Sequence, residues 1–447
     1  MPRKPETMPT AARTVARDRT APLLFSTGVV LALALAGMAW LGDLYAHVRS
    51  FVLLFVVASG AYAVAVAAVV RHPVVEPRVL RGVLAAAVLF RLILLPTTPS
   101  LSTDVYRYAW DGRLAVAGVS PYRHPPNAPD LATLRDPVLY PRLNHPDWLT
   151  VYPPGAQLLF AGIAWLRPGS VGPFKMVVAA FDLLTLALLL GWLRAVGRPP
   201  AWALLYAWHP LVVVELAGSA HLDAVVFATS VGALWAASRG RETWAGALVG
   251  LGALVKLSPA LLLAAVVRRR PWHALGACGA VVLAGYALYL RDGPAVLGSL
   301  PRYVAEEEWN PAIRGILELL LARFGPGGLR AARLLPLAAL GVVTVAVAWG
   351  ARDRPVAERG RSVVGAWLLL TPSLFPWYPL WMVPILAVAP AWPWLYLSCA
   401  SALTYLVFAE PVWHIPAWVV AVEFVPFALG LALGGRCRPG RVGRSSR

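Results

Sequence analysis

Apolar runs of about 20 residues recur along the whole chain and constrain its fold more than any other feature. One covers residues 21–41, and others cover 51–70, 173–193 and 416–434. A helix of about 20 residues crosses the ~30 Å hydrocarbon core of a bilayer, and inside lipid each backbone N–H must bond within its own segment. The alternating pattern of a membrane β-barrel is missing from the sequence. The chain is therefore predicted to be an all-α polytopic membrane protein.

Fourteen segments have the composition of helices that cross or enter the membrane. They cover residues 21–41, 51–70, 82–95, 173–193, 200–216, 222–238, 243–256, 258–267, 272–290, 330–350, 362–375, 378–390, 393–409 and 416–434. Some are too short to cross alone, and Pro259 and Pro379 would break two of them into half-helices. We expect about 12–14 transmembrane helices in a single domain over 21–435.

The charge pattern indicates which side of the membrane each segment occupies. Charged residues make up 14% of the 447 residues and the net charge is +18. The basic residues fall in short clusters between apolar segments, which argues against nucleic-acid binding and for the positive-inside rule. Together, 24 of the 40 Lys and Arg residues lie in seven short segments: 1–20, 71–81, 194–198, 239–241, 268–270, 351–361 and 436–447.

This distribution predicts that both termini lie in the cytoplasm. We expect the protein to reside in the plasma or inner membrane. Residues 1–20 are predicted to be a disordered basic tail, and 436–447 a second basic tail. The run over 21–41 is longer than the apolar region of a cleaved signal peptide, so we interpret it as a retained anchor.

The segment YPPGAQLLFAGIAWL, residues 152–166, decides the topology of the region around it. It has only about 13 residues after its prolines, fewer than a membrane crossing needs, so we expect an interfacial helix on the outer face. If it crossed, every later loop would change sides and the charge bias would invert. Residues 96–172 are then one large extracytoplasmic loop, and 291–329 form a second outer loop.

The stretch STDVYRYAWDGRLAVAGVSPY, residues 102–122, concentrates two carboxylates, two arginines and four aromatic residues in this outer loop. Asp104 and Asp111 fall seven residues apart on the same predicted helical face. A positioned carboxylate can act as a general base on a hydroxyl group. The structural alternatives are a helix cap for Asp104 and an i,i+4 ion pair with Arg107 for Asp111.

Further polar and aromatic residues are predicted on the same face. GSAHLDAV contributes His221 and Asp223, VKLSP contributes Lys256, and FPWYP contributes Trp377 and Tyr378. Aromatic faces beside carboxylates suit sugars, which have apolar faces and hydroxyl rims. The alternatives are a helix cap for the first pair, snorkelling for the lysine and an interfacial aromatic belt for the last pair. Glu306–Glu308 are interpreted as a solvated loop.

Five stretches occur in the order found in a known family. They are TDVYRYAWDGRLAVAGVSPY, NHPDWLTVYPPGAQLLF, AWHPLVVVELAGSAHLDAVV, GALVKLSPALLL and TPSLFPWYPLWMVPIL. In them the chain resembles the GT-C glycosyltransferases, especially the polyprenol-phosphate-mannose-dependent mannosyltransferases and glycosyltransferase family 87. The resemblance covers about residues 82–390 and leaves the first two helices outside the common module.

The resemblance implies a GT-C type helical bundle that transfers a hexose, by this likeness mannose, from a polyprenyl-phosphate-sugar donor to a glycan or lipid hydroxyl at the outer membrane face. Asp104 occupies the position of the family's general base, whose attack inverts the anomeric carbon, and Asp111 is the competing carboxylate. Candidates for the donor phosphate are Lys256, Arg107 and Arg113. Candidates for sugar or acceptor contacts are His221, Asp223, His145, Tyr152, Trp377 and Tyr378.

Other functions stay open at this point. A transporter or lipid flippase with a polar outer gate is the main alternative, although the sequence shows no internal repeat and its polar residues gather on one face. A related enzyme for glucose or arabinose and a polymer ligase using a polyprenyl diphosphate are further alternatives. No spacing specifies metal ligands or another cofactor, so a divalent metal has no support from the residues.

Overall fold

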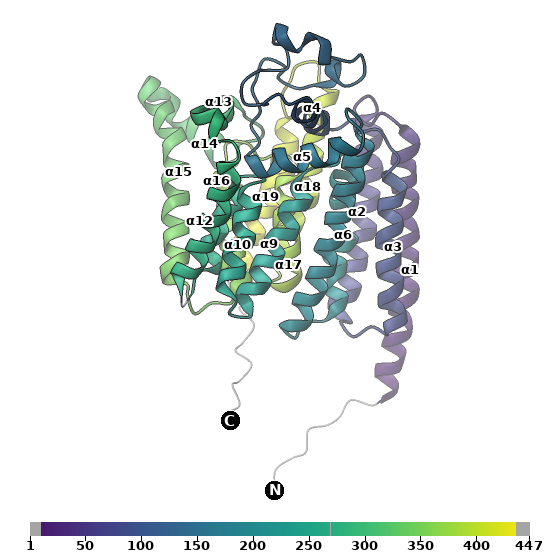
Figure 1. Ribbon diagram of the computed structural model, residues 1–447. Coiled ribbons are helices and arrows are strands. Elements are labelled where there is room, and N and C mark those ends of the chain that lie inside the picture. Colours follow the sequence, from purple (N-terminus) through teal and green to yellow (C-terminus); the bar gives the residue numbers. More distant parts are fainter. Residues whose placement is uncertain (1–9, 269, 435–447) are drawn as a thin grey trace.

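The computed structural model describes residues 10–268 and 270–434, with side chains from residue 20 onward. The outermost parts of the two predicted basic tails, 1–9 and 435–447, lie outside the described residues, and helix α1 begins at Thr10, within the first tail. Across the described ranges the fold is helical, and its extended structure is a single bridge between Trp309 and Ser373. The protein is thus an all-α helical bundle (Figure 1).

Six helical segments in the described part of the chain are long and apolar enough to cross a membrane. A seventh and an eighth are added if two bent helix pairs, kinked by 60° and 109°, each count as one span. The six are Thr20–Leu41 of α1, α2 (Val48–Arg71), α6 (Gly172–Ala195), Ala312–Gly350 containing α14 (Ala312–Leu321) and α15 (Gly325–Gly350), Trp392–Ala409 containing α18 (Trp392–Ala400), and α19 (Ala417–Gly434).

The other expected spans are shorter, broken or more charged, which is why the structure yields fewer full-length helices than the 12–14 expected. The short helices that run alongside the long ones are α3 (Pro77–Leu94), α9 (Asp223–Ser238), α10 (Glu242–Ala253), α12 (Pro271–Ala287) and α16 (Val356–Leu370) (Figure 1). The remaining pieces are α7 (Leu204–Ala207), α8 (Pro210–Val213), α11 (Leu263–Val266), α13 (Leu300–Glu306) and α17 (Val383–Val388). Together they form a polytopic membrane bundle.

The break between α7 and α8 is stabilised by a buried ion pair. Pro210 cannot continue the helix before it, which frees carbonyl groups at the break. Arg91 of α3 donates to the carbonyl of Ala207 at 2.6 Å and pairs with Asp182 of α6 at 2.7 Å. Because an unpaired carbonyl is costly in lipid, this arginine replaces the missing helical bond. The broken element then leads into the segment before His221.

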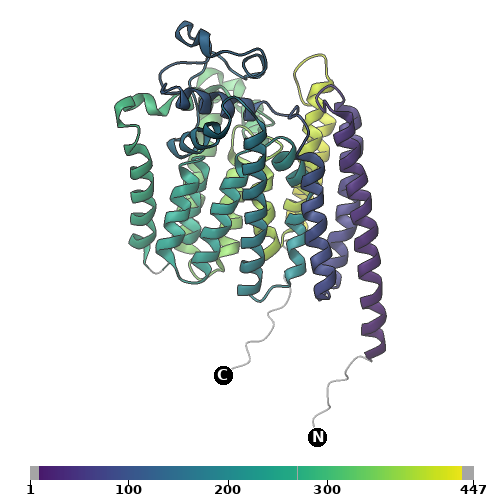
Figure 2. The same cartoon turned by 45° about the vertical axis from the view of Figure 1, so that its right-hand side comes forward.

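Two helices lie across one end of the bundle instead of passing through it. They are α4 (Asp104–Val116) and α5 (Pro154–Leu166), both at the top of Figure 1. They approach closely at Gly112, where a Cβ atom would come within 2.6 Å of the carbonyl oxygen of Phe160. The interfacial position in the membrane expected for residues 152–166 stays a prediction. α1 begins and α19 ends at the opposite end (Figure 2).

The first two helices form a hairpin that packs against the C-terminal part of the bundle. Tyr62 of α2 donates its hydroxyl to the carbonyl of Leu205 at 2.6 Å. Phe51 of α2 meets the ring of Tyr405 edge-on, with centroids 5.9 Å apart. The hairpin is therefore an integral part of the bundle, and the turn at its top reaches the end where α4 lies.

Candidate active site

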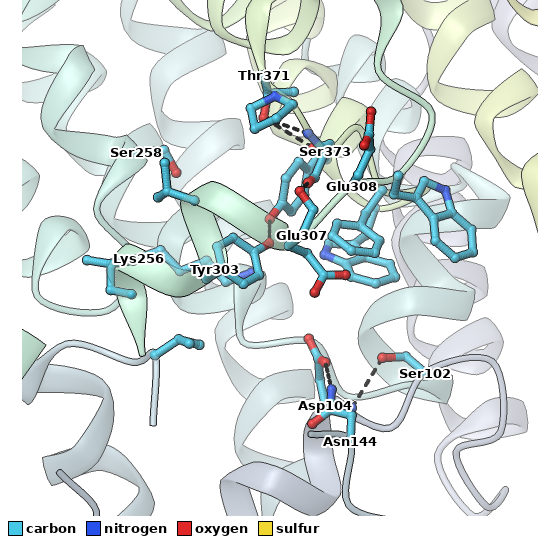
Figure 3. Close-up of a pocket in the computed structure, with 18 of the residues that line it drawn as sticks. Ser102, Asp104, Asn144, Lys256, Ser258, Tyr303, Glu307, Glu308, Thr371 and Ser373 are labelled. Carbon is cyan, nitrogen blue, oxygen red and sulfur yellow. Dashed lines mark hydrogen bonds between the residues drawn. The ribbon is translucent and has the colours of Figure 1, made fainter. Parts of the chain in front are cut away.

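A cavity of about 930 Å³ opens at the end of the bundle where α4 and α5 lie. Its lining comes from Tyr45 and from residues in the ranges 100–107, 144–153, 256–261, 300–314, 333–340, 367–378 and 405–413. Asp104 and Asn144 stand on one side of the cavity, and Tyr303, Glu307 and Glu308 stand on the other (Figure 3). The cavity therefore joins the first large loop, the second one and the Trp377 loop in one place.

Asp104 presents a carboxylate with unused acceptor capacity to this cavity. It is the first residue of α4, and the N-cap position belongs to Thr103 before it, whose side chain makes no capping hydrogen bond. Its side chain is 20% exposed. Asn144 donates to Oδ1 at 3.3 Å, and the hydroxyl of Tyr108 donates to Oδ2 at 3.5 Å. Both contacts are long, which leaves lone pairs on both oxygens for a ligand.

Behind Asp104 a buried imidazole lies between two carboxylates. His221 Nδ1 lies 3.7 Å from Asp104 Oδ2, and His221 Nε2 lies 3.3 Å from Glu215 Oε2. Tyr405 donates its hydroxyl to the other oxygen of Glu215 at 2.7 Å. Ala220, just before the histidine, has φ of 60°, a strained conformation for a residue with a Cβ atom. Such strain accompanies functional segments, and here the backbone turns His221 toward Asp104.

Lys256 lines the cavity and is fixed by Asp223. Its Nζ lies 2.7 Å from Asp223 Oδ2, and the indole N–H of Trp381 donates to Oδ1 at 2.7 Å. Asp223 is buried at the start of α9, behind the cavity wall. The structure thus brings Lys256 to the site, whereas Asp223 and His221 lie one layer behind it.

Asp111 and its neighbours on α4 form a separate buried network. The Nε of Arg107 donates to Asp111 Oδ1 at 2.9 Å, and the amide of Gln157 donates to Oδ2 at 2.9 Å. Asp111 is fully buried. Arg107 reaches the cavity wall, although its Nη2 is bound to the carbonyl of Trp148. The i,i+4 ion pair expected as the structural alternative is therefore present.

Arg113 lies away from the cavity and organises the first large loop. Its Nη1 pairs with Asp136 at 2.5 Å and donates to the carbonyl of Leu134 at 2.8 Å. Two backbone N–H groups and Arg113 hold the pKa of Asp136 below its usual range, although partial burial opposes the shift. These contacts hold the chain around residue 136 against α4.

His145 and Tyr152 enter the cavity from the first large loop. His145 Nε2 lies 3.5 Å from Glu307 Oε2, and this contact raises the pKa of His145. Burial raises the pKa of the Tyr152 hydroxyl, whose ring meets that of Tyr108 edge-on with centroids 5.1 Å apart. His145 thus links the two large loops, since Glu307 belongs to the second one.

Trp377 and Tyr378 line the cavity and do not form the outward-facing belt that was the alternative. The Trp377 ring stacks on His221 with centroids 4.0 Å apart. The hydroxyl of Tyr378 lies 3.0 Å from that of Tyr303. Both residues are packed among aromatic side chains. Their rings therefore form the wall that faces Asp104's side of the cavity.

Several cavity residues were missed by sequence reasoning. Asn144 stood in a stretch used for the resemblance, but its role beside Asp104 depends on how the loop folds back. Tyr303 lies in the predicted outer loop 291–329, which has no periodic pattern, and Arg333 follows that loop. Tyr405 lies outside residues 82–390, which the resemblance covers. Glu307 was expected in a solvated loop, whereas it lines the cavity.

The described residues contain no group of three or more His, Cys, Asp or Glu side chains placed to hold a metal ion. Cations of the protein itself reach the cavity instead. Besides Lys256 and Arg107 these are Arg314, which pairs with Glu318 at 2.8 Å, and the exposed Arg333, 4.0 Å from the same carboxylate. The site therefore combines the partly exposed carboxylate of Asp104 with several nearby cations.

Comparisons with known proteins bear on what this site does. The model of glycosyltransferase family 87 matches residues 149–372, half of the chain. A curated relative, the "Polyprenol-phosphate-mannose-dependent alpha-(1-2)-phosphatidylinositol pentamannoside mannosyltransferase" of Mycobacterium tuberculosis (strain CDC 1551 / Oshkosh), is 27% identical over 305 residues. That match covers 59% of this chain and 67% of the relative. No solved structure matches the chain.

Proposed function

The chain belongs to glycosyltransferase family 87 and is a multi-pass membrane glycosyltransferase, and we propose that it transfers mannose from a polyprenyl-phosphate donor to an acceptor hydroxyl. The observation that carries this proposal is the partly exposed carboxylate of Asp104, which faces a cavity lined by cations and aromatic rings. Family membership removes most of the support for the transporter alternative.

In the proposed reaction, Asp104 takes the proton of the acceptor hydroxyl while that oxygen attacks the anomeric carbon. The bond from this carbon to the phosphate oxygen breaks, and polyprenyl phosphate leaves with the electron pair. A single displacement inverts the anomeric centre, so a β-linked donor yields an α-linkage. A positioned general base contributes roughly 10²–10⁴-fold to such a step. Behind Asp104 lies His221, with its Nδ1 3.7 Å from Asp104 Oδ2, and Glu215 lies 3.3 Å from the other ring nitrogen.

The leaving phosphate needs positive charge near its oxygens. Lys256 supplies it in this proposal, because Asp223 fixes its ammonium group at the cavity wall. Arg333 is a second candidate, since it is exposed and has only a distant carboxylate partner. Arg107 and Arg113 are less suited, because strong bonds to Asp111 and Asp136 already occupy them.

One arm of the cavity suits a lipid chain. The aliphatic part of the lining, which begins next to Lys256, is made by Leu257, Leu261, Pro336, Leu337, Leu340 and Leu370. Apolar area of this kind gains roughly 25 cal/mol for each Å² removed from water. A polyprenyl chain lying here would bring its phosphate next to Lys256. This arm supports a lipid-linked donor over a soluble nucleotide sugar.

The choice of mannose and the choice of membrane side rest on different observations. Mannose is chosen because the relative named above depends on polyprenol-phosphate-mannose. The extracytoplasmic side is chosen because 24 of the 40 Lys and Arg residues lie in the tails and loops predicted to be cytoplasmic. The cavity lies at the end of the bundle opposite the start of α1 and the end of α19 (Figure 2).

The test uses the purified full-length protein in liposomes with β-linked polyprenyl-phosphate sugars and a short mannoside acceptor. We expect transfer from the mannose donor, reduced transfer from the glucose donor, and an α-linked product by NMR. The control is Asp130→Asn, which changes an exposed carboxylate in the first large loop and should leave the transfer rate unchanged. A β-linked product would overturn the inverting mechanism, and transfer from neither donor would overturn the proposed donor class.

A further inference from the structure

The second arm of the cavity is built from aromatic rings that form an unbroken series ending beside Asp104. Consecutive ring centroids lie 4.0 to 6.3 Å apart. From the rim inward the rings are those of Tyr45, Phe408, Trp309, Phe375, Trp377 and His221. Trp413 flanks the outer part, 5.5 Å from Phe408 and 5.7 Å from Trp309. Every ring except that of His221 lines the cavity.

The series runs from an open rim to a buried end. Tyr45 is 49% exposed and Trp413 is 63% exposed, whereas Trp309 and Trp377 are buried. Exposed aromatic side chains at the mouth of a cavity are available to a ligand that extends out of it. The inner end of the series is His221, whose ring contacts the catalytic carboxylate.

The outer rings come from parts of the chain outside the matched family segment. Tyr45 lies in the turn between α1 and α2, and Phe408 and Trp413 follow residue 372, where the match ends. The turn is well defined, because the N–H groups of Tyr45 and Ala46 both donate to Asp43 Oδ1, at 3.0 and 3.1 Å. The N–H of Leu44 donates to Ser100 Oγ at 2.9 Å. The last bond ties the hairpin to the segment that leads into α4.

The two arms have different chemistry. The lining near Lys256 is largely aliphatic, whereas the outer rings of Tyr45, Phe408 and Trp413 meet their neighbours at tilted or edge-on angles instead of stacking on them. The polar side chains of Ser102, Asn144 and Ser373 also line the cavity. Flat apolar faces beside polar atoms match sugar rings, and aliphatic walls match hydrocarbon chains. A ligand in the aromatic arm is therefore a glycan and not a second lipid tail.

This inference rests on the proposed function. We propose that Tyr45, Phe408 and Trp413 form an outer acceptor subsite, which binds the sugars of the acceptor glycan other than the one whose hydroxyl reacts. The reacting sugar then lies beside Asp104, and the rest of the glycan extends past Trp309 toward Tyr45. The N-terminal hairpin is thereby a specificity element that selects an oligosaccharide acceptor over a monosaccharide.

The test compares a methyl mannoside with an α-linked mannotetraose as acceptors for Tyr45→Ala and Trp413→Ala. We expect KM for the tetrasaccharide to rise about three- to tenfold, the effect of losing one aromatic contact. KM for the monosaccharide and kcat for both acceptors should stay within twofold, and Tyr45→Phe should restore the wild-type KM. The matched control is Trp40→Ala, which removes an aromatic side chain of the same hairpin that is 87% exposed and outside the cavity.

Two results would overturn the subsite. One is an unchanged KM for the tetrasaccharide in both alanine variants, with thermal unfolding as in wild type. The other is a rise in KM that depends on a lipid anchor on the acceptor and not on the number of sugars. Failure of the proposed function is distinguishable from both, because wild-type protein would then transfer no sugar to either acceptor.

Discussion

Asp104 and Asp111 are the same residue type on one face of α4, yet their surroundings give them opposite properties. Asp111 is fully buried and receives two bonds of 2.9 Å, from Arg107 and Gln157. Asp104 is partly exposed, and its contacts with Asn144 and Tyr108 are 3.3 and 3.5 Å long. A carboxylate whose oxygens are fully hydrogen-bonded stabilises the fold, whereas one with free lone pairs at a cavity is available to accept a proton. The surroundings of each carboxylate, and not the residue type, therefore distinguish the structural Asp111 from Asp104, the candidate general base.

The largest expected effect is the loss of transfer in Asp104→Asn. The amide preserves the size of the side chain and its neutral contacts, but it cannot accept the acceptor's proton. We expect kcat to fall by roughly 10²–10⁴-fold. The measurement is initial transfer rate in liposomes, alongside thermal unfolding in detergent. Unchanged transfer would remove the distinction between the two carboxylates.

The next largest effect is on stability and concerns Asp111→Ala. This change leaves the guanidinium of Arg107 buried without its carboxylate, which typically costs about 3–5 kcal/mol of unfolding free energy. We expect a clearly lowered thermal unfolding midpoint, with transfer still detectable in the protein that stays folded. An unchanged midpoint with abolished transfer would make Asp111 the functional carboxylate.

A smaller effect is expected from His221→Gln, which tests whether the buried imidazole acts through Asp104. We expect kcat to fall by about tenfold, equivalent to about 1.4 kcal/mol, with both KM values within twofold. In the Asp104→Asn background the same change should have no further effect on kcat, because residues that act as one unit are not additive. Two independent losses that multiply would contradict a shared role.

The smallest effect concerns pH and the contact between His145 and Glu307. Glu307 raises the pKa of His145, so the charged pair is fully formed below the ordinary value of about 6.5 and is lost as pH rises through the raised value. His145 is 46% exposed, so screening limits the gain to under about 1 kcal/mol.

Thermal unfolding of wild type and Glu307→Gln between about pH 5 and pH 9 measures this contribution. Wild type should be more stable at the acidic end, and the two proteins should converge at the basic end. A stability difference that grows as pH rises would contradict the assigned sign.

The sequence was sufficient for the helical membrane class, the family and the presence of Asp104, Lys256 and Trp377 in one region. Each of these rests on a local pattern, such as an apolar run or a short polar motif. The state of Asp111 was not predictable, because Gln157 reaches it from another helix. The approach of His221 to Asp104 depends on the break at Pro210 and on the strained backbone at Ala220.

Long-range packing also explains the other differences. Tyr405 and Tyr45 reach the site from the two ends of the chain, where no local signal connects them to Asp104. An apolar segment expected as one helix, residues 200–216, is divided at Pro210 into the pair Pro200–Ala207 and Pro210–Gly218, which bends by 60°. Local composition predicts that a segment is apolar and helical, but tertiary contacts decide whether it continues.

The most direct test of the central claim measures sugar transfer by Asp104→Asn and Asp111→Asn in parallel, each normalised to the folded protein present. Both changes replace a carboxylate by an amide of nearly the same shape on the same helix. We predict that Asp104→Asn transfers at least about 100-fold more slowly than Asp111→Asn. Equal rates, or a slower Asp111→Asn, would contradict the assignment of Asp104 as the general base.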